Sequence, residues 1–79
     1  MQTIFVMIKT ELGQAYQVAA RAVEIEGVSE VHSVSGQYDL LVKCYLDKGT
    51  DIGHFVTETL QKLEGVKDTF TLIGFKAFS

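Results

Sequence analysis

A twelve-residue stretch occurs twice in this chain of 79 residues, and the repeat limits the folds that the chain can adopt. The segment IEGVSEVHSVSG at residues 25–36 resembles LEGVKDTFTLIG at residues 63–74, and one constant offset aligns the two. Each copy follows a segment in which apolar residues have helical spacing, and each helical segment follows a run typical of a β-strand. The repeat therefore predicts the order strand, helix, strand, twice over.

Apolar periodicity and glycine positions divide the chain into six elements. Helical spacing predicts one helix at residues 14–26, stopped by Gly27, and a second that Thr50 or Asp51 caps and Gly65 ends. Alternation and β-branched or aromatic residues predict strands at residues 2–9, 28–35, 40–46 and 67–78. The order βαββαβ with a central hairpin is the ferredoxin-like plan, which predicts one α+β domain spanning residues 1–79.

Two helices can cover only one face of a four-stranded sheet, because right-handed crossovers place both helices on the same side. The run from Leu40 to Leu46 nevertheless has large side chains at nearly every position, so its second face is apolar as well. Each large side chain removed from water contributes about 1.5–3 kcal/mol, which favours association over exposure. We therefore expect a homodimer with sheet packed on sheet, a dimeric α+β barrel or sandwich.

Composition and charge exclude several functional classes. Cys44 is the single cysteine, so no disulfide forms within the chain, and the thiol is expected to pack as a small hydrophobe. Scattered basic residues and a net charge of −3 argue against direct binding of nucleic acid. No run is long enough to span a membrane and no signal-peptide layout opens the chain, so we expect a cytoplasmic protein. We expect no metal and no cofactor.

The turn GQYD, from Gly36 to Asp39, has two readings. As a plain hairpin turn it needs a glycine for positive φ and an aspartate that bonds its own backbone. As a binding site it would offer backbone N–H groups to a ligand carboxylate and the Asp39 carboxylate to a ligand ammonium. A free α-amino acid would satisfy both halves, and Tyr38 could wall the pocket or pack at an interface.

The last predicted strand and the histidines are weaker candidates. Thr69 and Thr71 lie on one face of that strand, where they serve either β-propensity or a ligand shared with another protomer's turn. His32 is expected at a sheet end or interface and His54 in the first turn of the second helix. Neither histidine has a sequence-near acid or nucleophile to orient, which argues against a catalytic dyad.

Together these residues resemble a known family. The segments IEGVSEVHSVSGQYDLLVKCYL and LEGVKDTFTLIGFK are similar to the ligand-sensing (RAM) domain of Lrp/AsnC transcription regulators. The markers are a Gly-Val pair before the second strand, the Gly36-x-x-Asp39 turn, and a second Gly-Val pair followed by Thr-x-Thr. The resemblance covers nearly the whole chain and includes no helix-turn-helix, so we expect a stand-alone member.

The resemblance implies a sensor that binds amino acids or related small metabolites between dimers, which assemble into octamers or decamers. It implies no catalysis, and gene regulation would need co-assembly with a full-length relative that carries the DNA-binding helices. His32 would lie at the rim of the site. Its turn and its facing wall would be formed by Ser35, Gly36, Gln37, Tyr38 and Asp39, and by Thr69, Thr71, Leu72 and Ile73.

Two other functions stay open at the level of sequence. Small dimeric α+β barrels include cofactor-free monooxygenases and isomerases, which need a roomy cavity with polar or titratable lining. Here the candidate lining is mostly apolar, with His32 and Tyr45 as exceptions. The chain could also be a structural partner that controls the oligomerisation of a larger regulator.

Overall fold

The computed structural model describes all 79 residues, and its elements follow the predicted order βαββαβ. Four antiparallel strands lie in the order β2-β3-β1-β4, so the first and last strands of the chain are neighbours. The predicted ferredoxin-like α+β fold is thus confirmed. The elements are β1 (Gln2–Thr10), α1 (Ala15–Ala22), β2 (Val28–Ser33), β3 (Leu40–Leu46), α2 (Ile52–Glu58), the short 3-10 helix η1 (Leu60–Lys62) and β4 (Val66–Gly74).

The first helix is shorter than its apolar pattern predicts. α1 ends at Ala22 instead of residue 26, and the N–H groups of Glu24 and Ile25 bond carbonyls only three residues back. This tighter turn carries the chain to Gly27, whose φ of +100° lies in the left-handed region. The glycine therefore redirects the chain into β2, but several residues after the helix has ended.

The second helix begins where predicted and ends early. Asp51 is the N-cap, and its carboxylate accepts a hydrogen bond from the His54 N–H at 2.9 Å. Thr59 leaves the helical conformation, with φ of −120°, and its hydroxyl donates to the Phe55 carbonyl at 2.6 Å. The chain then continues as η1, so one predicted helix is two short ones.

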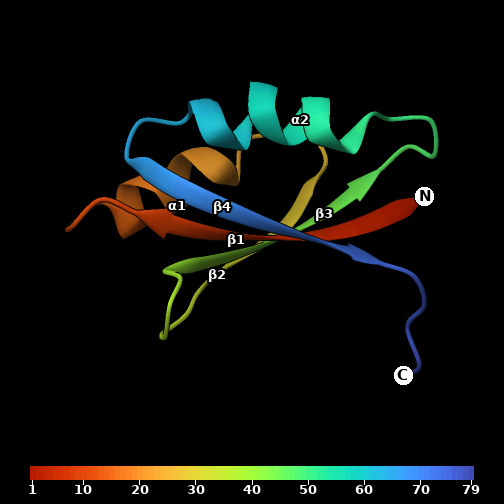
Figure 1. Ribbon diagram of the computed structural model, residues 1–79, viewed down its shortest axis with the longest axis horizontal. Helices are drawn as coiled ribbons and strands as arrows, with labels where there is room; N and C mark the ends of the chain where they lie inside the picture. The colour runs from red at the N-terminus through yellow and green to blue at the C-terminus, as the bar shows by residue number, and fades with distance from the viewer.

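Both helices lie on one side of the sheet, as Figure 1 shows. The strands bury the side chains that face the helices, because alternate residues of a strand point to opposite faces. These residues pack against the inner sides of α1, α2 and η1. The core consists of Ile4, Val6, Ile8, Val18, Ala22, Leu40, Val42, Cys44, Leu46, Val56 and Leu60.

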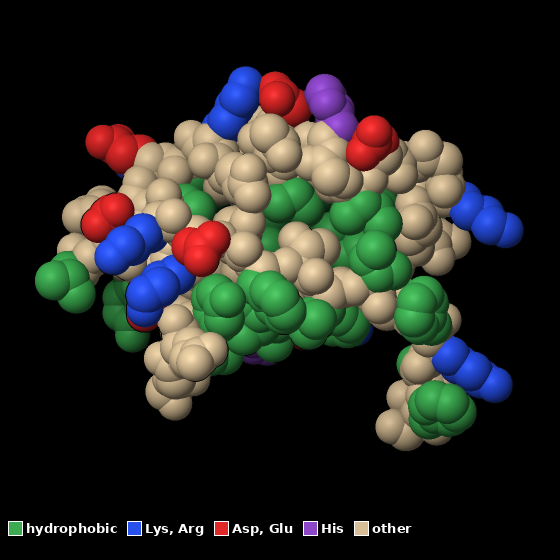
Figure 2. All heavy atoms as spheres, viewed as in Figure 1, with side chains coloured by type: hydrophobic (Ala, Val, Ile, Leu, Met, Phe, Trp, Pro, Cys, Tyr) green, Lys and Arg blue, Asp and Glu red, His purple; other side chains and the backbone are tan.

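The opposite side of the sheet, here called the open face, carries no covering element. Phe70 and Leu72 of β4 are 51% and 46% exposed there, and Tyr45 of β3 is 39% exposed. Hydrophobic side chains gather along this lower side in Figure 2, while charged side chains lie on the outer side of the helices. The open face comprises Thr3, Phe5, Met7, Lys9, Glu30, His32, Leu41, Lys43, Tyr45, Asp68, Phe70 and Leu72.

Two segments project on the side of the open face, one at each end of the sheet (Figure 1). One is the turn between β2 and β3. The other is the tail after Gly74, in which Phe75 and Phe78 are almost fully exposed. The tail was predicted to continue the last strand to residue 78, but β4 ends at Gly74. Thr3 and Gly74 are the last pair, and β1 offers no further partner beyond Gln2.

Candidate functional site

The turn between β2 and β3 is held to the end of the sheet by its own backbone. The Val34 N–H donates to the Asp39 carbonyl at 2.9 Å, and the Asp39 N–H donates to the Ile8 carbonyl at 2.9 Å. Gly36 has φ of +113°, and a Cβ there would meet no atom within 4 Å. The glycine is therefore required by backbone conformation and not by space.

The Asp39 carboxylate already has a partner inside the protomer. Its Oδ2 accepts the Thr10 N–H at 2.8 Å and the Thr10 hydroxyl at 3.3 Å. Ile8 and Leu40 are the last paired residues of β1 and β3. Beyond that pair, the Asp39 carboxylate accepts the hydrogen bond that a carbonyl of β3 would otherwise accept from the Thr10 N–H. The bond from the Thr10 backbone is the main reason that the pKa of Asp39 lies below its ordinary value. This carboxylate therefore completes the hydrogen bonding between β1 and β3 at the end of the sheet.

The predicted facing wall is divided between the two faces of β4. Thr69, Thr71 and Ile73 are the register partners of Ile8, Val6 and Ile4, and so point toward the helices. Leu72 points to the open face.

The Thr69 hydroxyl accepts a hydrogen bond from the Gln61 amide at 2.7 Å. A single protomer therefore cannot present Thr69 and Leu72 on one wall. Whether another protomer's turn meets either set stays a prediction.

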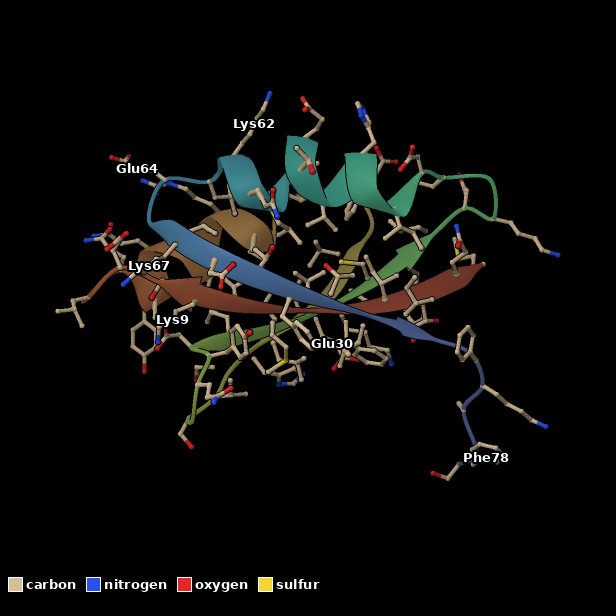
Figure 3. The ribbon with its side chains drawn as sticks, viewed as in Figure 1. Lys9, Glu30, Lys62, Glu64, Lys67 and Phe78 are labelled. Atoms are coloured by element: carbon tan, nitrogen blue, oxygen red, sulfur yellow. The ribbon has the colours of Figure 1, made fainter.

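His32 has an acid beside it, and the prediction that it has none is wrong. Its Nε2 lies 2.8 Å from Oε1 of Glu30, two residues earlier on the same face of the edge strand β2. Glu30 Oε2 lies 3.9 Å from the Lys43 ammonium. The hydrogen bond from His32, followed by the charge of Lys43, lowers the pKa of Glu30. The three side chains form a row of polar contacts across β2 and β3 on the open face (Glu30 is labelled in Figure 3).

Two residues that the sequence did not indicate as binding residues line a hollow of about 310 Å³ beside the turn. Lys9 and Asp68 line it together with Gln37 and Tyr38. They are register partners on β1 and β4, far apart in the sequence. A signal was available, because the ferredoxin-like order places the end of the first strand beside the start of the last. Figure 3 shows Lys9 on the side of the sheet away from α2.

A second hollow of about 310 Å³ lies at the other end of the open face, between the strands and the tail. Phe5, Lys43 and Tyr45 line it from the sheet, and Phe75 from the tail. No group of histidine, cysteine, aspartate and glutamate side chains is arranged to hold a metal. No helix has the length and apolar character needed to cross a membrane.

Comparison with known families gives one match across the chain. The model of the Lrp/AsnC ligand binding domain matches residues 3–79. An uncharacterised HTH-type transcriptional regulator of Pyrococcus abyssi is 33% identical over 76 residues, which cover 92% of this chain and 51% of that protein. The chain thus spans about half the length of the curated relatives that it matches first.

An enzyme and two solved structures also match. A homocitrate synthase of Sulfolobus acidocaldarius is 41% identical over 59 residues, which cover 75% of this chain and 12% of the enzyme. TTHA0845 from Thermus thermophilus superposes with a TM-score of 0.90 at 34% identity, covering 100% of this chain and 99% of that one. The transcriptional regulator NMB0573 of Neisseria meningitidis, solved with L-Met, has a TM-score of 0.85 at 21% identity, covering 99% of this chain and 52% of that one.

Proposed function

Because this chain belongs to the Lrp/AsnC ligand-binding domain family, we propose that it senses a free amino acid or a closely related small metabolite. The observation that carries the proposal is that one domain sequence matches proteins of unlike activity. It accounts for half of HTH-type regulators and for 12% of a homocitrate synthase. A domain shared by both is best explained as the part that responds to a small molecule. The L-Met complex of NMB0573 supports an amino acid as that molecule.

The sensing unit that we propose is a dimer joined through the open face. Leu41, Phe70 and Leu72 stay partly or largely exposed there in one protomer. Phe70 and Leu72 are already about half covered, so burying the rest of each against a second copy would contribute about 1 kcal/mol. The turn and the tail project on this same side and would flank the second sheet (Figure 1). We expect such dimers to assemble further into octamers or decamers that share ligands between protomers.

The proposed role is non-catalytic. The space between the sheet and the helices is filled by aliphatic side chains, and Thr10 is the one buried polar residue. Burial raises the pKa of the Cys44 thiol to about 11, so the thiol stays protonated at neutral pH and is a poor nucleophile. His32 and Glu30 lie on an exposed surface without a nucleophile between them. These features support a sensor over a barrel enzyme with an enclosed reaction chamber.

Any effect on transcription would pass through a helix-turn-helix partner, either joined to this domain or assembled with it. Seven basic residues are scattered over a domain of net charge −3, which is a poor surface for phosphate groups. The HTH-type relatives support such a partner. Their regulatory role also supports our placing the protein in the cytoplasm.

A panel of the free amino acids tests the proposal by thermal shift and calorimetry. Ligand at 100 times its dissociation constant should stabilise the fold by about 2.7 kcal/mol, visible as a higher Tm. We expect a subset of the panel to do so, and the D-enantiomers of that subset serve as matched controls. Light scattering in parallel reports the assembly. If no amino acid raises Tm while the assembly stays intact, the sensing role is wrong.

A further inference from the structure

The hollow beside the turn brings two opposite charges to one end of the open face. Lys9 on β1 and Asp68 on β4 are register partners and point to the same side of the sheet. They form no ion pair within 4.0 Å, although no strand lies between them. Both side chains are exposed at the rim of a hollow of about 310 Å³. A lysine and an aspartate held apart in this way suit a ligand that carries both charges.

Both groups retain free hydrogen-bonding capacity. The Lys9 ammonium donates one hydrogen bond, to the Gln37 carbonyl at 3.2 Å, and an ammonium has three N–H donors. Asp68 Oδ1 accepts from the Thr69 N–H at 2.9 Å, which leaves Oδ2 unpaired. Asp39 also keeps one free oxygen, Oδ1, because both bonds from Thr10 go to Oδ2, but Asp39 does not line this hollow. Asp68 is therefore the carboxylate that a ligand in this hollow can reach.

An aromatic surface adjoins the two charges. Tyr38, which lines the hollow, stacks on Phe70 with ring centroids 6.2 Å apart and an angle of 24° between the planes. Phe70 belongs to the surface that the proposed dimer covers, so it supports the Tyr38 ring, and that ring is the apolar surface that lines the hollow. Such a surface favours apolar or aromatic groups over charged ones.

We propose that Lys9 binds the α-carboxylate and Asp68 the α-ammonium of an amino acid whose apolar or aromatic side chain lies against Tyr38. This inference rests on the proposed function and assigns its polar contacts to two residues outside the turn. The turn contributes Gln37, whose carbonyl positions the Lys9 ammonium, and Tyr38. Asp39 holds the turn in place through Thr10 and does not contact the ligand.

Calorimetry with L-leucine and L-phenylalanine tests the assignment on the full chain. The matched probes are their amides, which lack the carboxylate, and their N-acetyl derivatives, which lack the ammonium. A hydrogen bond to a charged group is worth about 1.5–3 kcal/mol, so Lys9→Gln and Asp68→Asn should each weaken binding about 10- to 100-fold. Lys9→Gln should leave amide binding unchanged, and Asp68→Asn should leave binding of the N-acetyl derivative unchanged.

Lys48→Gln and Asp47→Asn are matched controls in the loop after β3. Their side chains form no hydrogen bond or ion pair, and they should bind as the unaltered protein does. Lys9→Arg and Asp68→Glu keep the charges and should retain most of the affinity. Should a neutral variant fail to fold, the acid and its amide compared on the unaltered protein still decide whether a carboxylate is recognised.

Two negative results have different meanings. If leucine or phenylalanine binds and the Lys9 and Asp68 variants match the controls, the assignment is overturned while the sensing role stands. Binding restricted to charged or small polar amino acids would overturn the aromatic surface as the selective element. If no amino acid binds the intact assembly, the proposed function itself fails.

Discussion

At the scale of single residues, the most informative side chain is the Asp39 carboxylate. The motif Gly36-x-x-Asp39 suggests a ligand contact when read along the sequence, yet the carboxylate is bonded to the backbone and hydroxyl of Thr10. Thr10 is 7% exposed, so its N–H would otherwise be buried without a strand partner. A residue that marks a binding turn can therefore act by shaping it.

Replacement of Asp39 should lower stability in a pH-dependent way. Asp39→Ala removes the acceptor and should lower Tm at neutral pH, whereas Asp39→Asn keeps an amide oxygen and should lower it less. Because the folded-state pKa of Asp39 is lowered, the stabilisation is complete above the ordinary aspartate pKa and is lost as pH falls through the lower folded value. The Tm difference between the unaltered protein and Asp39→Ala should therefore shrink on acidification.

Thermal unfolding followed by circular dichroism at a series of pH values measures this difference. Asp47→Ala is the control, because that carboxylate accepts no hydrogen bond. A Tm difference that stays constant as the pH falls would contradict the assigned role.

At the scale of elements, α1 packs so closely on the connection into β4 that the glycine of the second Gly-Val pair, Gly65, is required there. Gly65 has φ of +97°, and a Cβ there would lie 2.9 Å from Cγ2 of Val18 and 3.2 Å from Cβ of Gln14. Its carbonyl accepts the Glu11 N–H at 2.8 Å. The glycine therefore serves a close approach of two elements as well as a turn.

Gly65→Ala should be more destabilising than Gly13→Ala. Both glycines have positive φ, but Gly13 has no atom within 4 Å of its would-be Cβ. Left-handed strain costs about 1–2 kcal/mol and forced overpacking about 1–3 kcal/mol, so we expect roughly 2–5 kcal/mol for Gly65 against 1–2 for Gly13. Urea unfolding midpoints measure both. Equal losses would show that the backbone conformation alone matters.

At the scale of the whole molecule, the main feature is that no helix covers the open face of the sheet. Two helices bury one face of the sheet, and apolar side chains remain on the other (Figures 1 and 2). An exposed apolar surface of this kind is typical of an interaction site. The proposed dimer would remove it from water and bring two turns and two tails to its borders.

Adjacent residues on opposite faces of β4 provide a matched test of this dimer. Leu72 is 46% exposed on the open face, and Ile73 is 53% exposed on the side of the helices. Leu72→Glu should shift the sedimenting species toward the single protomer, because a carboxylate buried at the interface is costly without a partner. Ile73→Glu should keep at least the mass of the dimer, because Ile73 lies outside the sheet-to-sheet interface. If both variants keep the mass of the unaltered protein, the open face is not the interface.

Local patterns were sufficient for the order of elements. Alternation in β1 and β3, helical spacing in α1 and α2, and the glycines that follow the helices depend only on neighbouring residues. The turn at residues 36–39 was found because the conformational preferences of glycine and aspartate are local. The ends of elements were predicted less well: residues 75–78 have strand composition, but no partner lies beside them.

The amino-acid sequence by itself determined the βαββαβ order, the two apolar faces of the sheet and the turn that closes its central hairpin. Only the tertiary structure decided that Lys9 lies opposite Asp68 and that the Asp39 carboxylate accepts a hydrogen bond from Thr10. The physical reason is how far apart in the sequence the interacting residues lie. Periodicity and turn conformation arise between residues close in the chain, whereas contacts across strands arise from a register that the packing of the whole sheet sets.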